Sequence, residues 1–192
     1  MRIRPLVGGD VGRYHALRQR GLIEHPEAFT SSAEEEAASP DKVAKRLSPD
    51  ARAPHDVVLG AFDGDALVGV VGMSVDPRAK VRHRGHVFGM YVAGEAARTG
   101  VGTQLLDALV AHARDCEGVD SLVLTVTSVS EGACRLYERA GFVAFGCEPG
   151  AIRVAGKPYD KLHMIRWLAV PARASSLTPA PPPHTGEGRY QR

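Results

Sequence analysis

The stretch GMYVAGEAARTGVGTQLLDALVAH, residues 89–112, carries the strongest structural signal in the chain. An apolar, strand-like segment breaks into a glycine-bearing turn and then becomes an amphipathic helix. Gly100 and Gly102 leave the backbone open, so that successive amide N–H groups can point into one small concavity. The helix that begins near Gly102 adds the positive end of its dipole. The stretch predicts an anion site suited to a phosphate-bearing cofactor, although an ordinary strand-to-helix turn without a ligand can carry the same glycines.

Two other phosphate-binding motifs do not fit this turn. A P-loop requires Lys and then Ser or Thr directly after its last Gly, whereas Thr103 and Gln104 follow Gly102. A dinucleotide-binding fingerprint requires a third Gly at the position that Leu105 occupies. Both motifs are therefore excluded.

Length and composition are those of a single soluble domain. The chain has 192 residues, of which 44% are hydrophobic and 24% charged, which suits one α/β domain with a full core. A net charge of +2 without a Lys/Arg block indicates no nucleic-acid partner. The longest mostly apolar run, residues 66–75, is too short to cross a bilayer, and the N-terminus has no signal-peptide apolar region. We expect no membrane partner and a cytoplasmic location.

The cysteines indicate neither a disulfide framework nor a metal site. Cys116, Cys134 and Cys147 are well separated, without a CxxC pair or a Cys/His cluster at zinc-ligand spacing. We therefore expect reduced thiols and no metal. A covalent nucleophile at Cys134 is an alternative, but no His or carboxylate accompanies it at a recognisable spacing.

The N-terminal quarter is expected to be largely helical. Residues 1–6 alternate as a short strand, and Asp10 can cap a helix that follows. The apolar positions of this helix are Val11, Tyr14, Leu17, Leu22 and Ile23. Ser39-Pro40 begins a second helix that runs to about Leu47 and is ended by Ser48-Pro49, with a polar loop over residues 25–38 between the two helices.

The middle of the chain predicts a sheet with one parallel crossover. Apolar, β-branched runs at 56–62 and 66–75 flank Asp63-Gly64-Asp65, a strong hairpin signal. Strands at 86–92 and 121–127 enclose the helix from 102 to about 114, which implies parallel pairing. The buried face of that helix is expected to comprise Val101, Leu105, Leu106, Leu109, Val110 and Ala113.

The C-terminal part predicts a helix over 130–140, stopped by Gly141 in a left-handed conformation. Strands at 142–147 and 159–168 then surround the turn Gly156-Lys157-Pro158. Residues 169–192 are expected to form a Pro- and Ser-rich disordered tail, because burial cannot repay the ordering entropy of such a composition.

The order of these elements, with the glycine turn after the fourth strand, resembles the GNAT superfamily of N-acetyltransferases, which bind acetyl-CoA. The resemblance covers residues 1–168 as one domain. It implies a mixed α/β (α+β) fold with a mostly antiparallel sheet of six to seven strands and about four helices on its two faces. The first specific segment is MYVAGEAARTGVGTQLL at 90–106. There the family has Gln or Arg, two variable residues, Gly, a variable residue, and Gly or Ala, so that Gly100 and Gly102 fit and Ala97 departs.

The second specific segment is LVLTVTSVSEGACRLYERAGF at 122–142. Ser130 occupies a position where the family has Asn. The residues that fit the pattern are Ala133, Leu136, Tyr137, Glu138, Gly141 and Phe142. Residues 17–36 are similar to the substrate-side helices of many members, and residues 159–164 to the last strand. The departures at Ala97 and Ser130 concern side chains, and an amide-based phosphate site does not depend on them.

The resemblance implies a cofactor site built largely from backbone. The amides of the turn would hold the pyrophosphate, and the end of the fourth strand would pair with the pantetheine arm and offer an N–H to the thioester oxygen. The implied residues are Met90, Tyr91, Val92, Arg98, Thr99, Gly100, Val101, Gly102, Thr103, Ser130 and Tyr137. Ser130 is expected to cap its helix, with a contact to the pantetheine arm as an alternative. Arg98, Arg135 and Arg139 either meet an outer phosphate or form a solvated basic face.

Acetyl transfer needs a proton donor for the leaving thiolate and a proton acceptor for the amine. Tyr137 is the expected donor, although a tyrosine on an apolar helix face is often only a core residue. The fourth strand lacks a carboxylate, and His86 is the candidate acceptor within it. A water relay or a carboxylate such as Glu24, Glu34 or Glu35 is the alternative.

We therefore expect acetyl transfer from acetyl-CoA to a primary amine of a small molecule or peptide, by direct transfer. Arg18, Glu24 and Phe29 are candidates for the acceptor pocket. The cluster Glu34-Glu35-Glu36 would suit a cationic amine as an acidic rim, or is simply solvated. Alternatives are a non-catalytic acyl-CoA-binding module and an enzyme that uses another nucleotide. The exposed strand edges of such a sheet are compatible with a homodimer.

Overall fold

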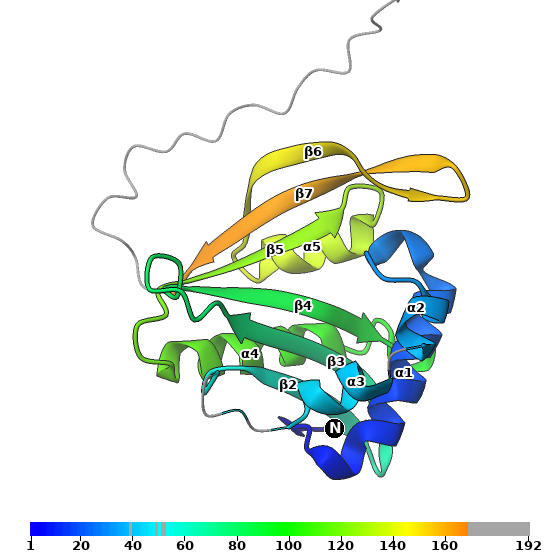
Figure 1. Ribbon diagram of the computed structural model, residues 1–192, viewed down its shortest axis with the longest axis vertical. Coiled ribbons are helices and arrows are strands. Elements are labelled where there is room, and N and C mark those ends of the chain that lie inside the picture. The colour runs from blue at the N-terminus through cyan, green and yellow to red at the C-terminus, as the bar shows by residue number, and fades with distance from the viewer. Residues whose placement is uncertain (39, 49, 51–52, 169–192) are drawn as a thin grey trace, which may run out of the picture.

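The computed structural model describes residues 1–38, 40–48, 50 and 53–168 (Figure 1). In these residues the strands are β1 (Arg2–Pro5), β2 (Val57–Asp63), β3 (Ala66–Val75), β4 (Arg84–Val92), β5 (Ser121–Thr127), β6 (Val143–Val154) and β7 (Lys157–Trp167). The helices are α1 (Val11–Glu24), α2 (Ala33–Ala37), α3 (Pro40–Arg46), α4 (Val101–Asp115) and α5 (Glu131–Arg139), with 3-10 turns at Gly8–Asp10, Pro26–Ala28 and Gly94–Ala96. The tail expected at 169–192 lies outside the described residues, as do Ser39 and Pro49 at the expected ends of the second helix.

The strands form one sheet in the order β1-β2-β3-β4-β5-β7-β6. Neighbouring strands are antiparallel except β4 and β5, which are parallel as the strand–helix–strand crossover predicted. The expected mixed, mostly antiparallel sheet is thus confirmed. In the described ranges no helix is both long and apolar enough to cross a bilayer.

The two parallel strands separate soon after they meet. β4 and β5 pair only from Arg84–His86 to Ser121–Val123 and then diverge (Figure 1). In the diverging part, Gly89 and Met90 of β4 lie opposite the single residue Val71 of β3, which is a β-bulge. Gly89 has a φ of 64°, a left-handed conformation that favours glycine. The edge of β4 that faces β5 therefore ends without a neighbouring strand.

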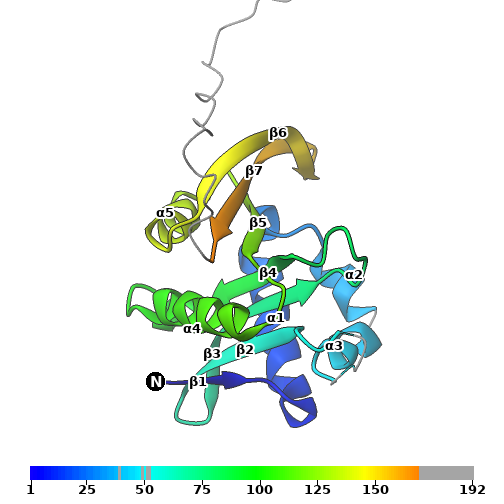
Figure 2. The same ribbon diagram turned by 90° about the vertical axis from the view of Figure 1, so that its left-hand side faces the viewer.

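Helices cover both faces of the sheet. Figure 2 shows α4 and α5 on one face and α1, α2 and α3 on the other. Every residue predicted for the buried face of α4 is buried, from Val101 to Ala113. The core on that face joins α4 to β3 and β5, and a second core beneath α1 contains Tyr14, Leu17 and Tyr91. Two hydrophobic layers thus hold the sheet between its helices.

The polar segment 25–38 is more ordered than predicted. It contains the 3-10 turn Pro26–Ala28 and the short helix α2, so the expectation of a loop is wrong there. Ser32 Oγ accepts from the Glu35 amide at 3.1 Å, and the Glu35 carboxylate accepts from the Ser32 amide at 2.9 Å. This reciprocal capping box satisfies two backbone donors and starts the helix.

The C-terminal hairpin is longer than predicted. β6 continues through Pro149-Gly150 to Val154, because the Gly150 amide donates to Asp160 Oδ1 at 2.8 Å and a register shift absorbs the irregularity. The turn consists of Ala155 and Gly156, whose φ values are 49° and 81°. Both residues are left-handed, as a tight two-residue hairpin turn requires. The predicted turn, which began at Gly156, was therefore one residue too late.

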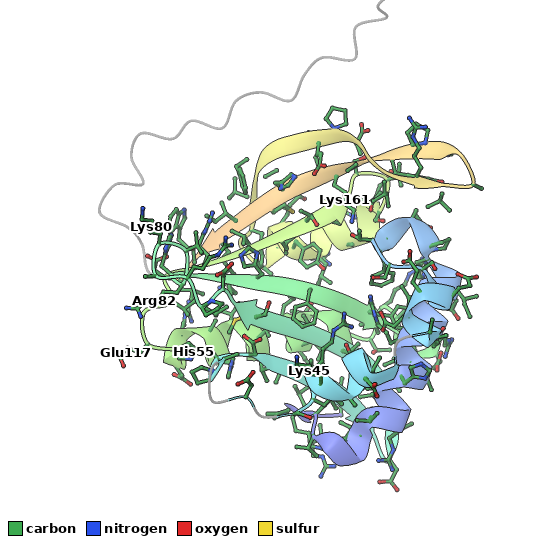
Figure 3. All side chains as sticks on the ribbon, viewed as in Figure 1. Lys45, His55, Lys80, Arg82, Glu117 and Lys161 are labelled. Atoms are coloured by element: carbon green, nitrogen blue, oxygen red, sulfur yellow. The ribbon has the colours of Figure 1, made fainter. Side chains whose placement is uncertain are left out.

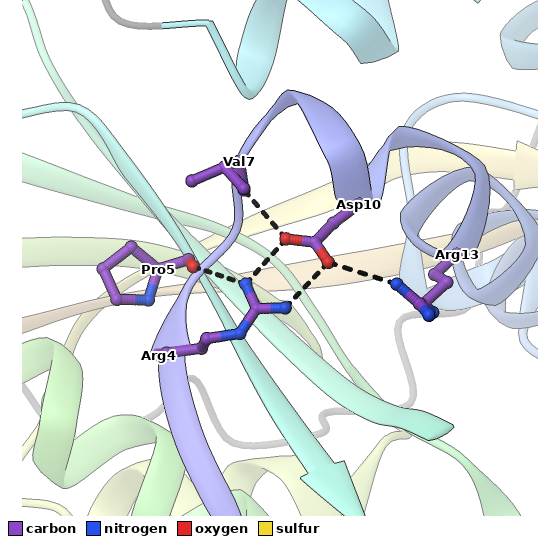
Figure 4. A network of polar contacts seen from close by, with 5 residues as sticks. All are labelled: Arg4, Pro5, Val7, Asp10 and Arg13. Atoms are coloured by element: carbon purple, nitrogen blue, oxygen red, sulfur yellow. Dashed lines mark hydrogen bonds and ion pairs between the residues drawn. The ribbon is translucent and has the colours of Figure 1, made fainter. Parts of the chain in front are cut away.

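Asp10 does not cap α1 as predicted. Its carboxylate accepts from Arg4 at 2.6 and 2.8 Å and from the Val7 amide at 3.0 Å, and Arg13 lies 3.6 Å away (Figure 4). The Arg4 guanidinium also lies 4.2 Å from the centre of the Phe62 ring. The hydrogen bonds from Arg4 lower the pKa of Asp10 to about 2. This carboxylate joins β1 to the start of α1 instead of binding the first amides of the helix.

Replacing this carboxylate is expected to destabilise the N-terminal part of the fold. The folded-state pKa of Asp10 lies below the unfolded value of 3.8, so its stabilisation is present above about pH 5 and is lost as the pH falls towards 2. We expect Asp10→Asn to lower the unfolding free energy at pH 7 by roughly 1 to 2 kcal/mol, allowing for solvent screening of Arg4. Denaturant unfolding between pH 7 and pH 3 measures both effects. Asp120→Asn, at an exposed aspartate outside this network, is the control. Equal pH dependence in wild type and Asp10→Asn would refute the assignment.

Candidate functional site

The glycine turn has the backbone conformation of an anion site. Gly100, at the N-terminus of α4, has a φ of 87°, and Arg98 is also left-handed with a φ of 62°. Thr99 Oγ1 donates to the Ala96 carbonyl at 2.8 Å, which fixes the approach to the helix. Among the described residues no side chain caps α4, so the amides at 101–103 remain available to a ligand. Together with the helix dipole they make a concavity suited to phosphate oxygens.

Gly102 brings the turn against the other cofactor segments expected from the sequence. A Cβ at this position would lie 3.0 Å from Leu136 Cδ2 and 3.4 Å from Met90 Cε. The turn, α5 and the bulged part of β4 therefore meet at one point. The residues of β4 from Met90 to Val92, the turn from Arg98 to Thr103 and helix α5 are thus neighbours in space.

Tyr137 lies on α5 with its ring in the core. The residue is 8% exposed, and its ring packs edge-on against Phe142 at a centroid distance of 5.8 Å. In the described part of the chain its hydroxyl takes part in no hydrogen bond with another residue. Burial raises the pKa of Tyr137 above its ordinary value, so the phenol keeps its proton at neutral pH. The ring is a core element, and the hydroxyl is available to another group.

Ser130 differs from what the sequence predicted, whereas Cys134 and Arg135 fit the expectations of a packed thiol and an exposed basic face. Ser130 stands at the N-terminus of α5, but its hydroxyl accepts no bond from the helix amides, so the expected side-chain cap is wrong. Its ψ of 64° departs from the extended backbone usual at an N-cap, such as the ψ of 165° at Ser32, so the hydroxyl does not reach those amides. Burial raises the pKa of the Cys134 thiol, the opposite of the shift that activates a nucleophilic cysteine. Arg135 is paired with Glu131 at 2.9 Å on the exposed face.

A cavity of about 480 Å³ opens on the α1 side of the sheet. Arg18, Phe29 and His86 line it. From the sequence, Arg18 and Phe29 were predicted to bind the acetyl acceptor and His86 to accept a proton. Gly89 also lines it, so the cavity reaches the β4 bulge. A neighbouring hollow of about 460 Å³, between α1, α2 and the tip of the β6–β7 hairpin, has no lining residue from β4 or β5.

One wall of the cavity rests on a buried ion pair. Arg18 Nε donates to Glu36 Oε1 at 3.1 Å, and the two side chains are 7% and 5% exposed. The Arg18 guanidinium lies 4.4 Å from the centre of the Phe29 ring, and Arg46 lies 3.7 Å from Glu36. Glu36 is therefore the buried ion-pair partner of Arg18 and Arg46. For Glu36, the expectation that Glu34-Glu35-Glu36 forms a solvated or substrate-binding rim is wrong.

Three ionisable residues that line the cavity were not predicted from the sequence: Arg46, Lys161 and Asp56. Lys161 is 7% exposed and donates to Thr30 Oγ1 at 3.0 Å, and burial lowers its pKa (Figure 3). Asp56 accepts from the Val75 amide at 2.8 Å, and burial raises its pKa. Neither Lys161, in the mixed polar and apolar strand segment 159–164, nor Asp56 is marked by a motif in the sequence.

Glu24 does not line the cavity. The Tyr91 hydroxyl donates to it at 2.6 Å and Arg20 at 2.7 Å, and these bonds lower its pKa, with Arg20 the larger cause. Burial and the bond to Glu24 raise the pKa of Tyr91 to about 12. Glu24 is thus an ionised carboxylate already engaged by two side chains. In the described ranges, no three side chains gather that could hold a metal ion.

Comparison with known proteins places this architecture among acetyltransferases. Mycothiol acetyltransferase of Propionibacterium freudenreichii is 28% identical over 141 residues, which are 73% of this chain and 42% of that protein. The chain therefore spans less than half the length of this curated relative.

Solved structures share the fold. An acetyltransferase of the GNAT family from Streptococcus pneumoniae matches with a TM-score of 0.72 and 25% identity, over 86% of this chain and 98% of its own. The protein yncA of Salmonella typhimurium, solved with its cofactor acetyl-CoA, matches with a TM-score of 0.71 and 19% identity, over 92% and 99% of the two chains. A family model described as the acetyltransferase (GNAT) family matches residues 20–142. Because that match covers more than half of the sequence, this chain belongs to the GNAT family of acetyltransferases.

Proposed function

We propose that this protein is an acetyl-CoA-dependent N-acetyltransferase that moves the acetyl group directly to a primary amine of a small molecule or peptide. One observation supports this most strongly. The amide turn before α4 and the cavity beneath α1 approach the same bulge of β4 from opposite faces of the sheet. Acetyl-CoA held on one side of the sheet and the amine held on the other would meet at this bulge, so the acetyl group could pass directly without an acetylated enzyme.

The chain's own groups suit the two ends of this reaction. When bound, acetyl-CoA supplies a thioester carbon that an amine can attack. The amides at 101–103 bind its diphosphate, and the unpaired edge of β4 from Met90 to Val92 offers donors and acceptors to the amide-bearing arm. As the C–N bond forms and the C–S bond breaks, the Tyr137 hydroxyl gives its proton to the departing sulfur.

The amine must lose a proton in the same reaction. His86 lines the cavity and lies opposite Ser74 in the β3–β4 register. Asp56 lines the same cavity, and its raised pKa makes it a better proton acceptor than an ordinary aspartate. We assign the role of proton acceptor to His86. Asp56 is the alternative proton acceptor if His86 does not serve.

A panel of primary amines with acetyl-CoA tests the proposed function. We expect thermal stabilisation by acetyl-CoA and release of thiol with at least one amine. Stabilisation without thiol release on any amine would instead indicate a non-catalytic acyl-CoA-binding module, which the departures at Ala97 and Ser130 would suit. Stabilisation by another nucleotide alone would contradict both.

The backbone of the turn can be tested at Gly100. An alanine in the left-handed conformation costs about 1 to 2 kcal/mol, so the turn of Gly100→Ala should relax and misdirect its amides. We expect acetyl-CoA affinity, measured by calorimetry, to fall roughly 10-fold. Gly118→Ala is a matched control, because Gly118 has a φ of 80° in a turn at the opposite end of α4. It should lose similar stability and keep its affinity. Equal affinity in both variants would remove the turn from the cofactor site.

Tyr137→Phe tests the proton donor. Because no described residue hydrogen-bonds to the hydroxyl, the substitution should leave the fold intact. We expect kcat to fall about 10- to 1,000-fold with acetyl-CoA affinity nearly unchanged. Tyr159→Phe, on β7, serves as the control. A normal kcat for Tyr137→Phe would leave Tyr137 with only its packing role.

The proton acceptor is tested by pH profiles. An imidazole changes charge between about pH 5 and 8, so the activity of the wild type should rise with pH in that range. We expect His86→Ala to lose that rise in kcat/KM measured from pH 6 to 9. Asp56→Asn should keep it. The reverse pattern would transfer the role to Asp56, and an unchanged rise in both variants would point to a water relay.

A further inference from the structure

The cavity beneath α1 carries more positive than negative groups. Arg18, Arg46 and Lys161 line it as basic side chains. Asp56 is the carboxylate among the lining residues, and Glu36 lies behind Arg18 and Arg46 as their ion-pair partner. Three cations thus face two carboxylates. Because the incoming amine itself becomes a cation when protonated, this balance does not suit a substrate that is only an amine.

Arg18 has hydrogen-bonding capacity that the protein does not use. Its Nε is bound to Glu36, but its Nη1 is buried and has no partner in the part of the chain that the structure describes. A buried donor of a charged group without a partner is unfavourable, and such groups are normally satisfied by an acceptor. The side chain is 7% exposed although it lines the cavity, so an acceptor for this donor has to come from the cavity.

Lys161 is a second enclosed cation, and among the described residues it has no carboxylate in direct ion-pair contact. Its Nζ donates to the neutral Thr30 hydroxyl at 3.0 Å. Glu148, its register partner on β6, acts on it electrostatically, but in the described residues no carboxylate oxygen lies within 4.0 Å of Nζ as an ion-pair partner. An ammonium has three donors, so Lys161 can bind a further acceptor. Burying such a charge is costly unless an anion accompanies it.

Arg18 places its positive charge close to the β4 bulge, where we propose that acetyl transfer takes place. Its free Nη1 lies 3.8 Å from the place where a Cβ on Gly89 would stand. Gly89 belongs to the β4 bulge, next to Met90 on the edge proposed for the cofactor arm. An anion bound by Arg18 would therefore be close to the reacting amine.

We propose that Arg18 and Lys161 form a carboxylate subsite in the acceptor cavity, and that the acceptor is a free amino acid. This inference rests on the proposed function, since it names the substrate of the same site. The carboxylate would supply acceptors for Nη1 and Nζ, as charge-assisted hydrogen bonds. The short distance between the subsite and the bulge selects an amine one or two carbons from its carboxylate. A peptide N-terminus, which has no carboxylate there, would be a poor substrate.

Binding and transfer are measured separately with compounds that differ only in the carboxylate. The twenty standard amino acids are first screened by thermal shift with the coenzyme A-saturated protein. Amino acids are then compared with their decarboxylated counterparts, such as leucine with 3-methylbutylamine and phenylalanine with 2-phenylethylamine, by calorimetry and by thiol release from acetyl-CoA. We expect at least one amino acid to bind about 10- to 100-fold more tightly than its decarboxylated counterpart.

Lys161→Met tests the subsite without leaving a carboxylate unpaired. It should reduce the affinity for the preferred amino acid about 10- to 100-fold and leave that for the decarboxylated amine nearly unchanged. Lys161→Arg, which keeps the charge, should restore part of the preference. Lys45→Met, at an exposed lysine of α3 that does not line the cavity, is the matched control and should have no effect (Figure 3).

The outcomes separate this proposal from the proposed function. If decarboxylated amines bind and react as well as amino acids, the subsite is refuted while acetyl transfer stands. If no amino acid binds, the subsite is likewise refuted. If an amino acid binds with the expected preference but no thiol is released, the subsite holds and the transferase assignment fails.

Discussion

The early separation of β4 from β5 is the constraint on which the site depends. Three residue pairs join the strands, and beyond them each strand has a partner only on its other side. Backbone polar groups seldom remain unpaired inside a protein, so this edge calls for an occupant that can hydrogen-bond like a strand. The bulge at Gly89 and Met90 adds a local change of direction at the same point. Among the described residues, an open edge of β4 with main-chain donors thus lies in the middle of the sheet.

The two faces of the sheet contribute different chemistry at this open edge of β4. On one face, Gly102 allows α4 to approach Leu136 and Met90 closely, which places the electropositive start of the helix beside β4. On the other face, the buried pair of Arg18 and Glu36 supports the wall of the acceptor cavity. The first arrangement uses backbone and tolerates side-chain changes such as Ala97. The second uses side chains, and we propose that it sets the specificity for the acetyl acceptor.

Local signals predicted the fold well, and long-range pairs limited the prediction of the site. The strand, the glycine turn and the amphipathic face of α4 are encoded within residues 89–112, and the structure reproduces them. The capping box of Ser32 and Glu35 was visible in the sequence but was overlooked. Ile23 fits the helical period yet is 69% exposed. Lys161 and Thr30 are 131 residues apart, so no local pattern could reveal that they meet.

The central claim is that the amide turn and the free edge of β4 together hold acetyl-CoA. A crystal structure of the protein with coenzyme A tests it most directly. The account predicts diphosphate oxygens within hydrogen-bond distance of the amides at 101–103 and the pantetheine arm paired with Met90–Val92. A coenzyme bound elsewhere, or a turn whose amides are occupied by the protein itself, would contradict it.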